Sequence, residues 1–258
     1  MTGVTQLQDV VYIACGKVPR IVRFNATTHE RLRDICMDFS TGDVRDIVAC
    51  KQTFELYVAE KGIVDSCFSA VIWRVSTHGT MWVREVVSGW NSSKPFLLSV
   101  TKTGILVTSE KYLRQLDTVS DETQRIVDLP SYMVAHHAVE SPTGTFIVSH
   151  VNLPLKQDQI SEVNTECQVL RQFSSSHSCL ERIAIDLQGK IFVADPGGHR
   201  ILLLNGQLAL RRVVIDERQL NNRKLQHLCY VEESGQLLVG LDFHGHVAVF
   251  DVVCRLHR

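Results

Sequence analysis

Two neighbouring histidines, His136 and His137, are the side chains of this 258-residue chain that come closest to a reactive pattern. They directly precede an apolar strand-like pair, Ala138-Val139. Adjacent residues of an extended chain point to opposite sides, so only one of the two imidazoles can face inward. Imidazole and carboxylate groups suit divalent metals, so the approach of Asp195, His150 or Glu60 from a neighbouring segment would make a metal site possible. Ordinary loop histidines are the alternative interpretation.

A second candidate is a basic cluster near residue 215. It could contact RNA phosphates or an acidic protein segment. Few aromatic residues for base stacking lie nearby, which weakens the RNA interpretation. The alternative is a solvated outer strand and loop. The cluster consists of Arg211, Arg212, Arg218, Arg223 and Lys224, with Arg200 upstream.

No motif for covalent or nucleotide chemistry is present in the sequence. It contains no nucleophile elbow, P-loop, dinucleotide fingerprint or H-E-x-x-H pattern, so we expect no catalytic residue, cofactor or metal. The formal net charge of -1 argues against a dedicated nucleic-acid binder. No signal peptide and no apolar run of about 18 residues is visible. We therefore expect a cytoplasmic protein without membrane contact.

One short apolar strand recurs along the whole chain. Its spacing of 41 to 49 residues, with four apolar or alternating segments in most units, is that of a propeller blade. Helical periodicity is not sustained anywhere for three turns. The six copies are centred on Ile13, Val58, Val107, Val148, Val193 and Val239.

The turns before these strands repeat as well. Glycines precede four of the centres, where a tight hairpin turn requires a positive φ; they are Gly104, Gly144, Gly189 and Gly235. The sequence therefore predicts an all-β fold, a six-bladed β-propeller of four-stranded antiparallel blades forming a single domain over residues 1–258. The approximate blades are 1–38, 39–90, 91–131, 132–175, 176–221 and 222–258.

The closure of the ring leaves two interpretations open. Residues 2–7 could supply the outermost strand of the last blade and so join the two ends of the chain. Alternatively, they form the innermost strand of the first blade and leave the last blade three-stranded. Their position directly before residues 11–15 favours the second interpretation.

Residues 183–204 resemble an NHL repeat, a family of six-bladed propellers. The matching residues are Asp186, Gly189, Phe192-Val193-Ala194-Asp195 and His199-Arg200-Ile201. The resemblance is close in this repeat and dilute in the others, where Glu60 or uncharged residues replace the aspartate. It implies a domain that binds proteins or RNA. Asp195 and Arg200 also have a structural interpretation, in which the aspartate accepts backbone N–H groups of the next turn and pairs with the arginine.

Three functions compete on these grounds. The first is a non-catalytic platform for protein partners, most simply as a monomer. The second is a metal-dependent hydrolase or lactonase whose pocket is the mouth of the channel, near His136, His137, Asp195 and His199. The third is RNA binding through Arg200, Arg211, Arg212, Arg223 and Lys224. We favour the protein platform over an enzyme, because the fold is complete and no catalytic motif accompanies it.

Overall fold

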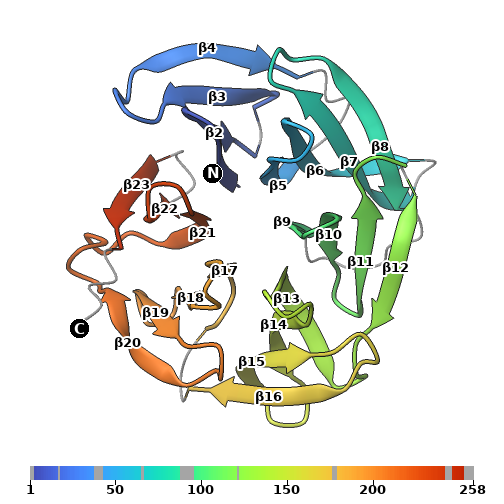
Figure 1. Cartoon of the computed structure of the whole chain (residues 1–258), viewed down its shortest axis with the longest axis vertical. Helices are drawn as coiled ribbons and strands as arrows, with labels where there is room; N and C mark the ends of the chain where they lie inside the picture. The colour runs from blue at the N-terminus through green and yellow to red at the C-terminus, as the bar shows by residue number, and fades with distance from the viewer. Residues whose placement is uncertain are drawn as a thin grey trace.

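The chain forms six antiparallel sheets around a central axis (Figure 1). The computed structural model describes residues 3–16, 18–37, 43–64, 67–87, 96–120, 122–175, 179–241 and 246–252. Every regular element within these ranges is a strand. The predicted all-β six-bladed propeller is therefore confirmed. In the same ranges, no helix has the length and apolar character needed to cross a bilayer.

The strands fall into four concentric layers, and consecutive strands pair within each sheet. The innermost layer is β1 (Gly3–Leu7), β5 (Asp43–Cys50), β9 (Leu97–Val100), β13 (Met133–Glu140), β17 (Ile183–Ile185) and β21 (Leu225–Val231). The second layer is β2 (Val10–Ala14), β6 (Glu55–Val64), β10 (Gly104–Thr108), β14 (Phe146–Asn152), β18 (Ile191–Asp195) and β22 (Gln236–Leu241). The third is β3 (Arg20–Asn25), β7 (Cys67–Ser76), β11 (Tyr112–Asp117), β15 (Gln157–Val163), β19 (Arg200–Leu204) and β23 (His246–Asp251). The outermost is β4 (Arg31–Cys36), β8 (Met81–Val87), β12 (Thr123–Asp128), β16 (Val169–Ser174) and β20 (Leu210–Ile215).

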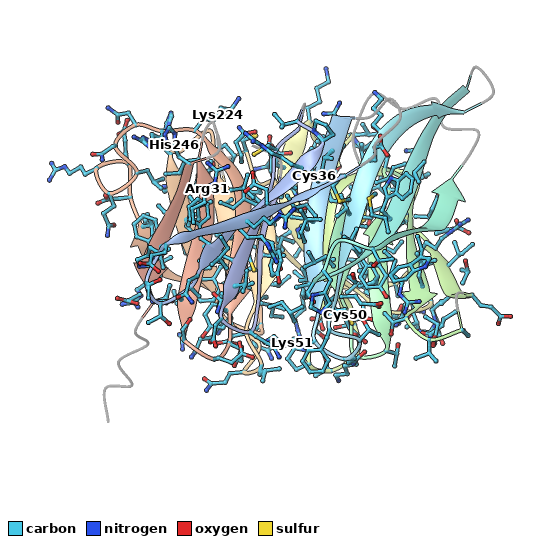
Figure 2. The ribbon with its side chains drawn as sticks, turned by 90° about the horizontal axis from the view of Figure 1, so that it is seen from above. Arg31, Cys36, Cys50, Lys51, Lys224 and His246 are labelled. Atoms are coloured by element: carbon cyan, nitrogen blue, oxygen red, sulfur yellow. The ribbon has the colours of Figure 1, made fainter. Side chains whose placement is uncertain are left out.

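Each innermost strand contacts the innermost strand of the next blade, from β1 through β21 and back to β1. The turns that follow these strands, such as 51–54 and 141–145, gather at one end of the ring, which we call the hairpin face. Lys51 lies at this end, and Lys224 and His246 lie at the other (Figure 2). The central channel runs between the two ends.

Burial decreases from the axis outward, as the patterning of the strands predicts. All five residues of β10 and of β18 are buried, because neighbouring blades cover both faces of these strands. β12 and β16 are mostly exposed. Val, Ile and Leu dominate the buried strands because side chains of this shape pack well on a pleated surface.

The ring closes through β1. Residues 3–7 pair with β2 as the innermost strand of the first blade, so the second interpretation of the N-terminal segment is confirmed. The sheet of the last blade, β21–β22–β23, accordingly has three strands among the described residues.

The repeated glycines serve two different purposes. Gly144, Gly189 and Gly235 adopt positive φ values of 84°, 80° and 66°, as expected for the hairpin turns. Gly104 is not among the residues with positive φ, so the conformational reason predicted for it is wrong. A Cβ at Gly104 would lie 1.8 Å from the carbonyl oxygen of Leu116 on the paired strand, so this glycine permits a close approach of two backbones.

We expect Gly104→Ala to destabilise the protein more than Gly144→Ala. Alanine at position 104 must displace a paired strand, which costs about 3 kcal/mol or more of unfolding free energy. Alanine at position 144 meets no atom within 4 Å and suffers only the strain of its positive φ, about 1–2 kcal/mol. Urea unfolding of both variants measures the difference, and equal losses would contradict this explanation of Gly104.

Candidate functional site: the central channel

The carboxylate of Asp46, on β5, is the centre of a hydrogen-bonded cluster that spans the channel. Its side chain is completely buried. Oδ1 accepts the Nε2–H of His227 at 2.7 Å and the backbone N–H of Ile47 at 2.9 Å. Oδ2 accepts Nη1–H of Arg182 and the backbone N–H of Leu98, both at 2.9 Å. Four donors therefore replace the water that the carboxylate loses on burial.

His137, on β13, continues the cluster to the remaining blades. Its Nε2 lies 3.2 Å from the carbonyl oxygen of Leu98, and its Nδ1 accepts the backbone N–H of Ile183 at 3.1 Å. Nδ1 must then be unprotonated, so the hydrogen-bond partners define one neutral tautomer with the proton on Nε2.

His227 has the same tautomer for the same reason. Its Nδ1 accepts the backbone N–H of Val4 at 3.4 Å, and its Nε2 donates to Asp46. With this bond to β1, the hydrogen bonds connect the innermost strands of all six blades. The cluster therefore holds the ring together across its axis.

Side chains of the cluster occupy equivalent positions in four blades. Asp46, His137 and His227 lie opposite Ala59, Ser149 and Gly240 on the second strands, one residue after the repeat centres. Arg182 lies opposite Ala194 in the same way, and its carbonyl oxygen accepts the N–H of that residue.

A β-bulge precedes three of these four residues. The pairing register shifts at Arg45, His136 and Gln226, so each is an extra residue directly before Asp46, His137 or His227. Bulges commonly re-aim the side chain that follows. They explain how a polar side chain enters an otherwise apolar innermost layer.

The first blade leaves space for the cluster. Gly3 lies opposite Ala14, in the position equivalent to Asp46. A Cβ at Gly3 would lie 2.8 Å from the backbone nitrogen of Ile47 and 3.2 Å from Oδ1 of Asp46. Glycine in this blade thus permits the carboxylate of the next blade to reach the axis.

The cluster shifts the pKa values of its members strongly. Burial alone would raise the pKa of Asp46, but the charge of Arg182 and the hydrogen bond from His227 outweigh it and hold the pKa well below the usual range. Burial, followed by the charge of Arg182, lowers the pKa of His137 to about 3. Burial also lowers the pKa of His227, although Asp46 partly opposes this shift. At neutral pH the carboxylate is ionised and both imidazoles are neutral.

A funnel-shaped cavity of about 660 Å³ occupies the channel between the cluster and the hairpin face. His137 and His227 line its inner end, whereas Asp46 and Arg182 are not part of the lining. Its wall is largely apolar, and its rim carries four acidic side chains and two lysines. The rim consists of Lys51, Lys102, Glu140, Asp186, Glu232 and Glu233.

The histidines and carboxylate at the inner end offer no free ligand atoms. Both ring nitrogens of His137 and of His227 have partners within the protein, and so do both oxygens of Asp46. Across the described part of the chain, no three His, Cys, Asp or Glu side chains form a group that could hold a metal. The cluster is suited to cross-linking strands rather than to proton transfer or metal binding.

Of the residues predicted for the channel mouth, the structure places only His137 in the channel. His136 points to the blade wall, where Nε2 lies 3.3 Å from Oδ1 of Asp158. Asp195 is buried at the end of β18 and His199 lies in the turn after it, with a φ of 47°. A binding role for these three residues stays a prediction.

Asp195 has the structural contacts that its position in the sequence indicates. Its oxygens accept the backbone N–H groups of Cys179 and Gly198 at 3.0 Å and Nε–H of Arg200 at 2.9 Å. It therefore braces the turn between β18 and β19.

The predicted basic edge is divided between the outermost layer and the end of the ring opposite the hairpin face. Arg211 and Arg212 are exposed on β20, and Arg223 and Lys224 precede β21. Arg200, at the start of β19, is paired with Asp195 at 2.9 Å. A binding role for these five residues stays a prediction.

Comparisons with known proteins identify the fold and no family. No family model matches the sequence, and no curated protein matches it. A chain of the mitotic checkpoint complex is similar in structure, with a TM-score of 0.64 and 9% identity over 96% of this chain and 72% of that chain. A chain of hydrazine synthase from Kuenenia stuttgartiensis has a TM-score of 0.62 and 10% identity over 96% of this chain and 94% of its own. At these identities the likeness shows the propeller fold alone.

We expect Asp46→Asn to reduce the unfolding free energy by about 3–5 kcal/mol, because it leaves the nearly buried Arg182 without its counter-charge. Asp158→Asn is the matched control and should cost less, about 1 kcal/mol, since Asp158 and its partner His136 both keep some contact with solvent. Urea unfolding of the two variants tests this. A loss at Asp46 no larger than at Asp158 would contradict the central role of the carboxylate.

We also expect stability to fall as the pH is lowered from about 6.5 towards 3. An unfolded histidine has a pKa of about 6.5. In this window His137 and His227 therefore bind protons in the unfolded chain but stay neutral in the folded protein, which favours unfolding. Each contributes at most about 1.4 kcal/mol of lost unfolding free energy per pH unit. His137→Gln should reduce the pH slope by nearly one proton. The slope of unfolding free energy against pH is measured by urea unfolding between pH 7 and 4.5. An unchanged slope for His137→Gln would refute the conclusion that the buried imidazole of His137 stays neutral.

Proposed function

We propose that this chain is an NHL-type propeller that acts as a protein-interaction platform, and that the hairpin face is its docking surface. The observation that carries the proposal is the combination of a funnel with apolar walls and a cluster at its inner end whose polar atoms are already bonded within the protein. Such a cavity can bury apolar side chains of a partner, and the polar atoms of the cluster at its inner end are already engaged.

The rim of the funnel indicates the chemistry of the partner. The carboxylates of Glu232 and Glu140 accept hydrogen bonds from the backbone N–H groups of Leu187 and Lys102, respectively. Glu233 forms an ion pair with Lys51 at 2.5 Å. Acidic groups nevertheless outnumber the lysines at the rim. A partner segment with an apolar anchor and flanking basic side chains fits this surface.

Exposed apolar side chains extend the surface beyond the funnel. Leu187 is 76% exposed and Phe54 is 55% exposed, both in hairpin turns of this face. Apolar groups surrounded by polar residues are common at protein interfaces. The structural similarity to a chain of the mitotic checkpoint complex is in keeping with a role within a protein assembly.

The NHL assignment rests on the geometry of the fifth blade. Asp186 accepts the backbone N–H groups of Gln188 and Lys190, and Gly189 has the positive φ that this turn requires. Asp195 pairs with Arg200 at the next turn. These contacts give a physical reason for Asp186, Asp195 and Arg200 of the repeat. We further propose that the protein is a cytoplasmic monomer.

Val100→Trp tests the docking surface, because Val100 lines the funnel and tryptophan would fill it. A partner recovered by crosslinking and affinity purification with the wild-type protein should bind this variant about thirtyfold more weakly, a loss of about 2 kcal/mol. Val119→Trp is the control, since Val119 is 85% exposed in the β11–β12 turn and does not line the cavity. Recovery of the same partner with equal affinity by both variants would reject the funnel as the docking site, and failure to recover any partner would count against a platform.

A further inference from the structure

Among the described residues, the last blade has three strands, whereas each of the other five has four. The sheets beginning at β1, β5, β9, β13 and β17 each have four strands, whereas β23 is the edge of a three-stranded sheet among the described residues. In Figure 1 the position outside β23 falls between β20 and β4, the outermost strands of the two neighbouring blades. This edge is distinct from the funnel on which the proposed function rests.

The open edge presents backbone groups in a regular register. The N–H of Val252 bonds to the carbonyl oxygen of Gly235, and the pairing of β23 with β22 has no register shift. Inward and outward groups alternate along an antiparallel strand. Val247, Val249 and Asp251 therefore direct their N–H and C=O groups away from β22, towards the open edge. Such an edge is a template for one more strand.

Among the described residues, the apolar layer beside this three-stranded sheet is only partly covered. Outermost strands elsewhere contribute buried residues to the packing between blades, including Ile35, Val127 and Ile215. The cluster between the last and first blades has five buried residues among those described, whereas each of the other clusters has at least ten. Val247 and Phe24 of this cluster are only half-buried. Val249, on the same side of β23 as Val247, is 41% exposed.

Basic side chains border the open position on both sides. Arg211 and Arg212 are exposed on β20, and Arg33 is exposed on β4. Arg31 is also exposed on β4, where it pairs with Asp34 at 2.8 Å. This charge favours an acidic strand over a basic one.

We propose that the edge of β23 binds an extended acidic segment of a partner protein, which completes the last blade by strand addition. The segment has about six residues, the usual length of a strand. Its apolar side chains alternate with acidic ones, so that one face covers Val247, Val249 and Phe24 while the other faces solvent.

A fluorescein-labelled synthetic peptide in which valine and glutamate alternate tests the proposal by fluorescence anisotropy. The wild-type protein should bind it, and should bind the corresponding valine–lysine peptide at least tenfold more weakly. Val249→Pro should weaken binding at least tenfold, because it removes an N–H that points to the open edge and not to β22. Val249→Thr keeps this N–H and should bind as the wild type does.

Charge is tested separately. The double variant Arg211→Ser and Arg212→Ser should weaken binding of the acidic peptide, whereas Arg125→Ser on β12, away from the open edge, should not. Equal binding by these two proteins would overturn the charge argument and with it the acidic partner.

Amide hydrogen exchange of the wild-type protein provides a readout that does not depend on the folding of Val249→Pro. Addition of the acidic peptide should slow exchange at Val247, Val249 and Asp251. Unchanged exchange there, absence of peptide binding, or equal binding by a folded Val249→Pro would overturn the proposal. Self-association of the wild type that Val249→Pro abolishes would also overturn it and assign the edge to a second copy. None of these outcomes depends on the Val100→Trp result, so the two proposals can fail separately.

Discussion

The carboxylate of Asp46 and its four hydrogen-bond donors form the interaction on which the arrangement of the blades depends. A propeller is held mainly by apolar packing between adjacent blades, which is not directional. The bonds to Leu98, Arg182 and His227 are directional and reach across the axis to three other blades. They define how the six innermost strands are placed around the channel, because His137 and His227 extend the bonding to the remaining blades.

The same bonds determine what the channel can do. A buried carboxylate beside two histidines would suit acid–base or metal chemistry if its atoms were free. Here the donors and acceptors are used between strands, and burial keeps both imidazoles neutral. The funnel above them retains its apolar wall and charged rim. Under the proposed function, the cross-linking of strands and the binding of a partner take place at two depths of one channel.

Much of the fold could be predicted from the sequence because the repeat is local. Strand centres, the conformations of Gly144 and Gly189, and the brace from Asp195 to Arg200 depend on a few neighbouring residues. The depth of burial follows equally from the apolar content of each strand.

The cluster could not be predicted in this way. Asp46 and His227 are 181 positions apart and meet only through the closed ring. Their side chains point inward because bulges at Arg45 and Gln226 precede them, and no residue pattern in the sequence marks these bulges. Equivalent positions in the blades carry different residue types, including Gly3, so no repeated motif marks them. His137 was recognised by residue type alone, and its neighbour His136 lies in the blade wall.

Nuclear magnetic resonance of the imidazole nitrogens tests the cluster most directly. Long-range ¹⁵N–¹H correlations distinguish protonated from unprotonated ring nitrogens in His137 and His227. The structure requires that both carry a single proton on Nε2 at pH 7 and that Nδ1 of His137 stays unprotonated on lowering the pH to 5. Titration of either ring with a pKa near 6.5, or a proton on Nδ1 at neutral pH, would contradict a hydrogen-bonded network through all six blades.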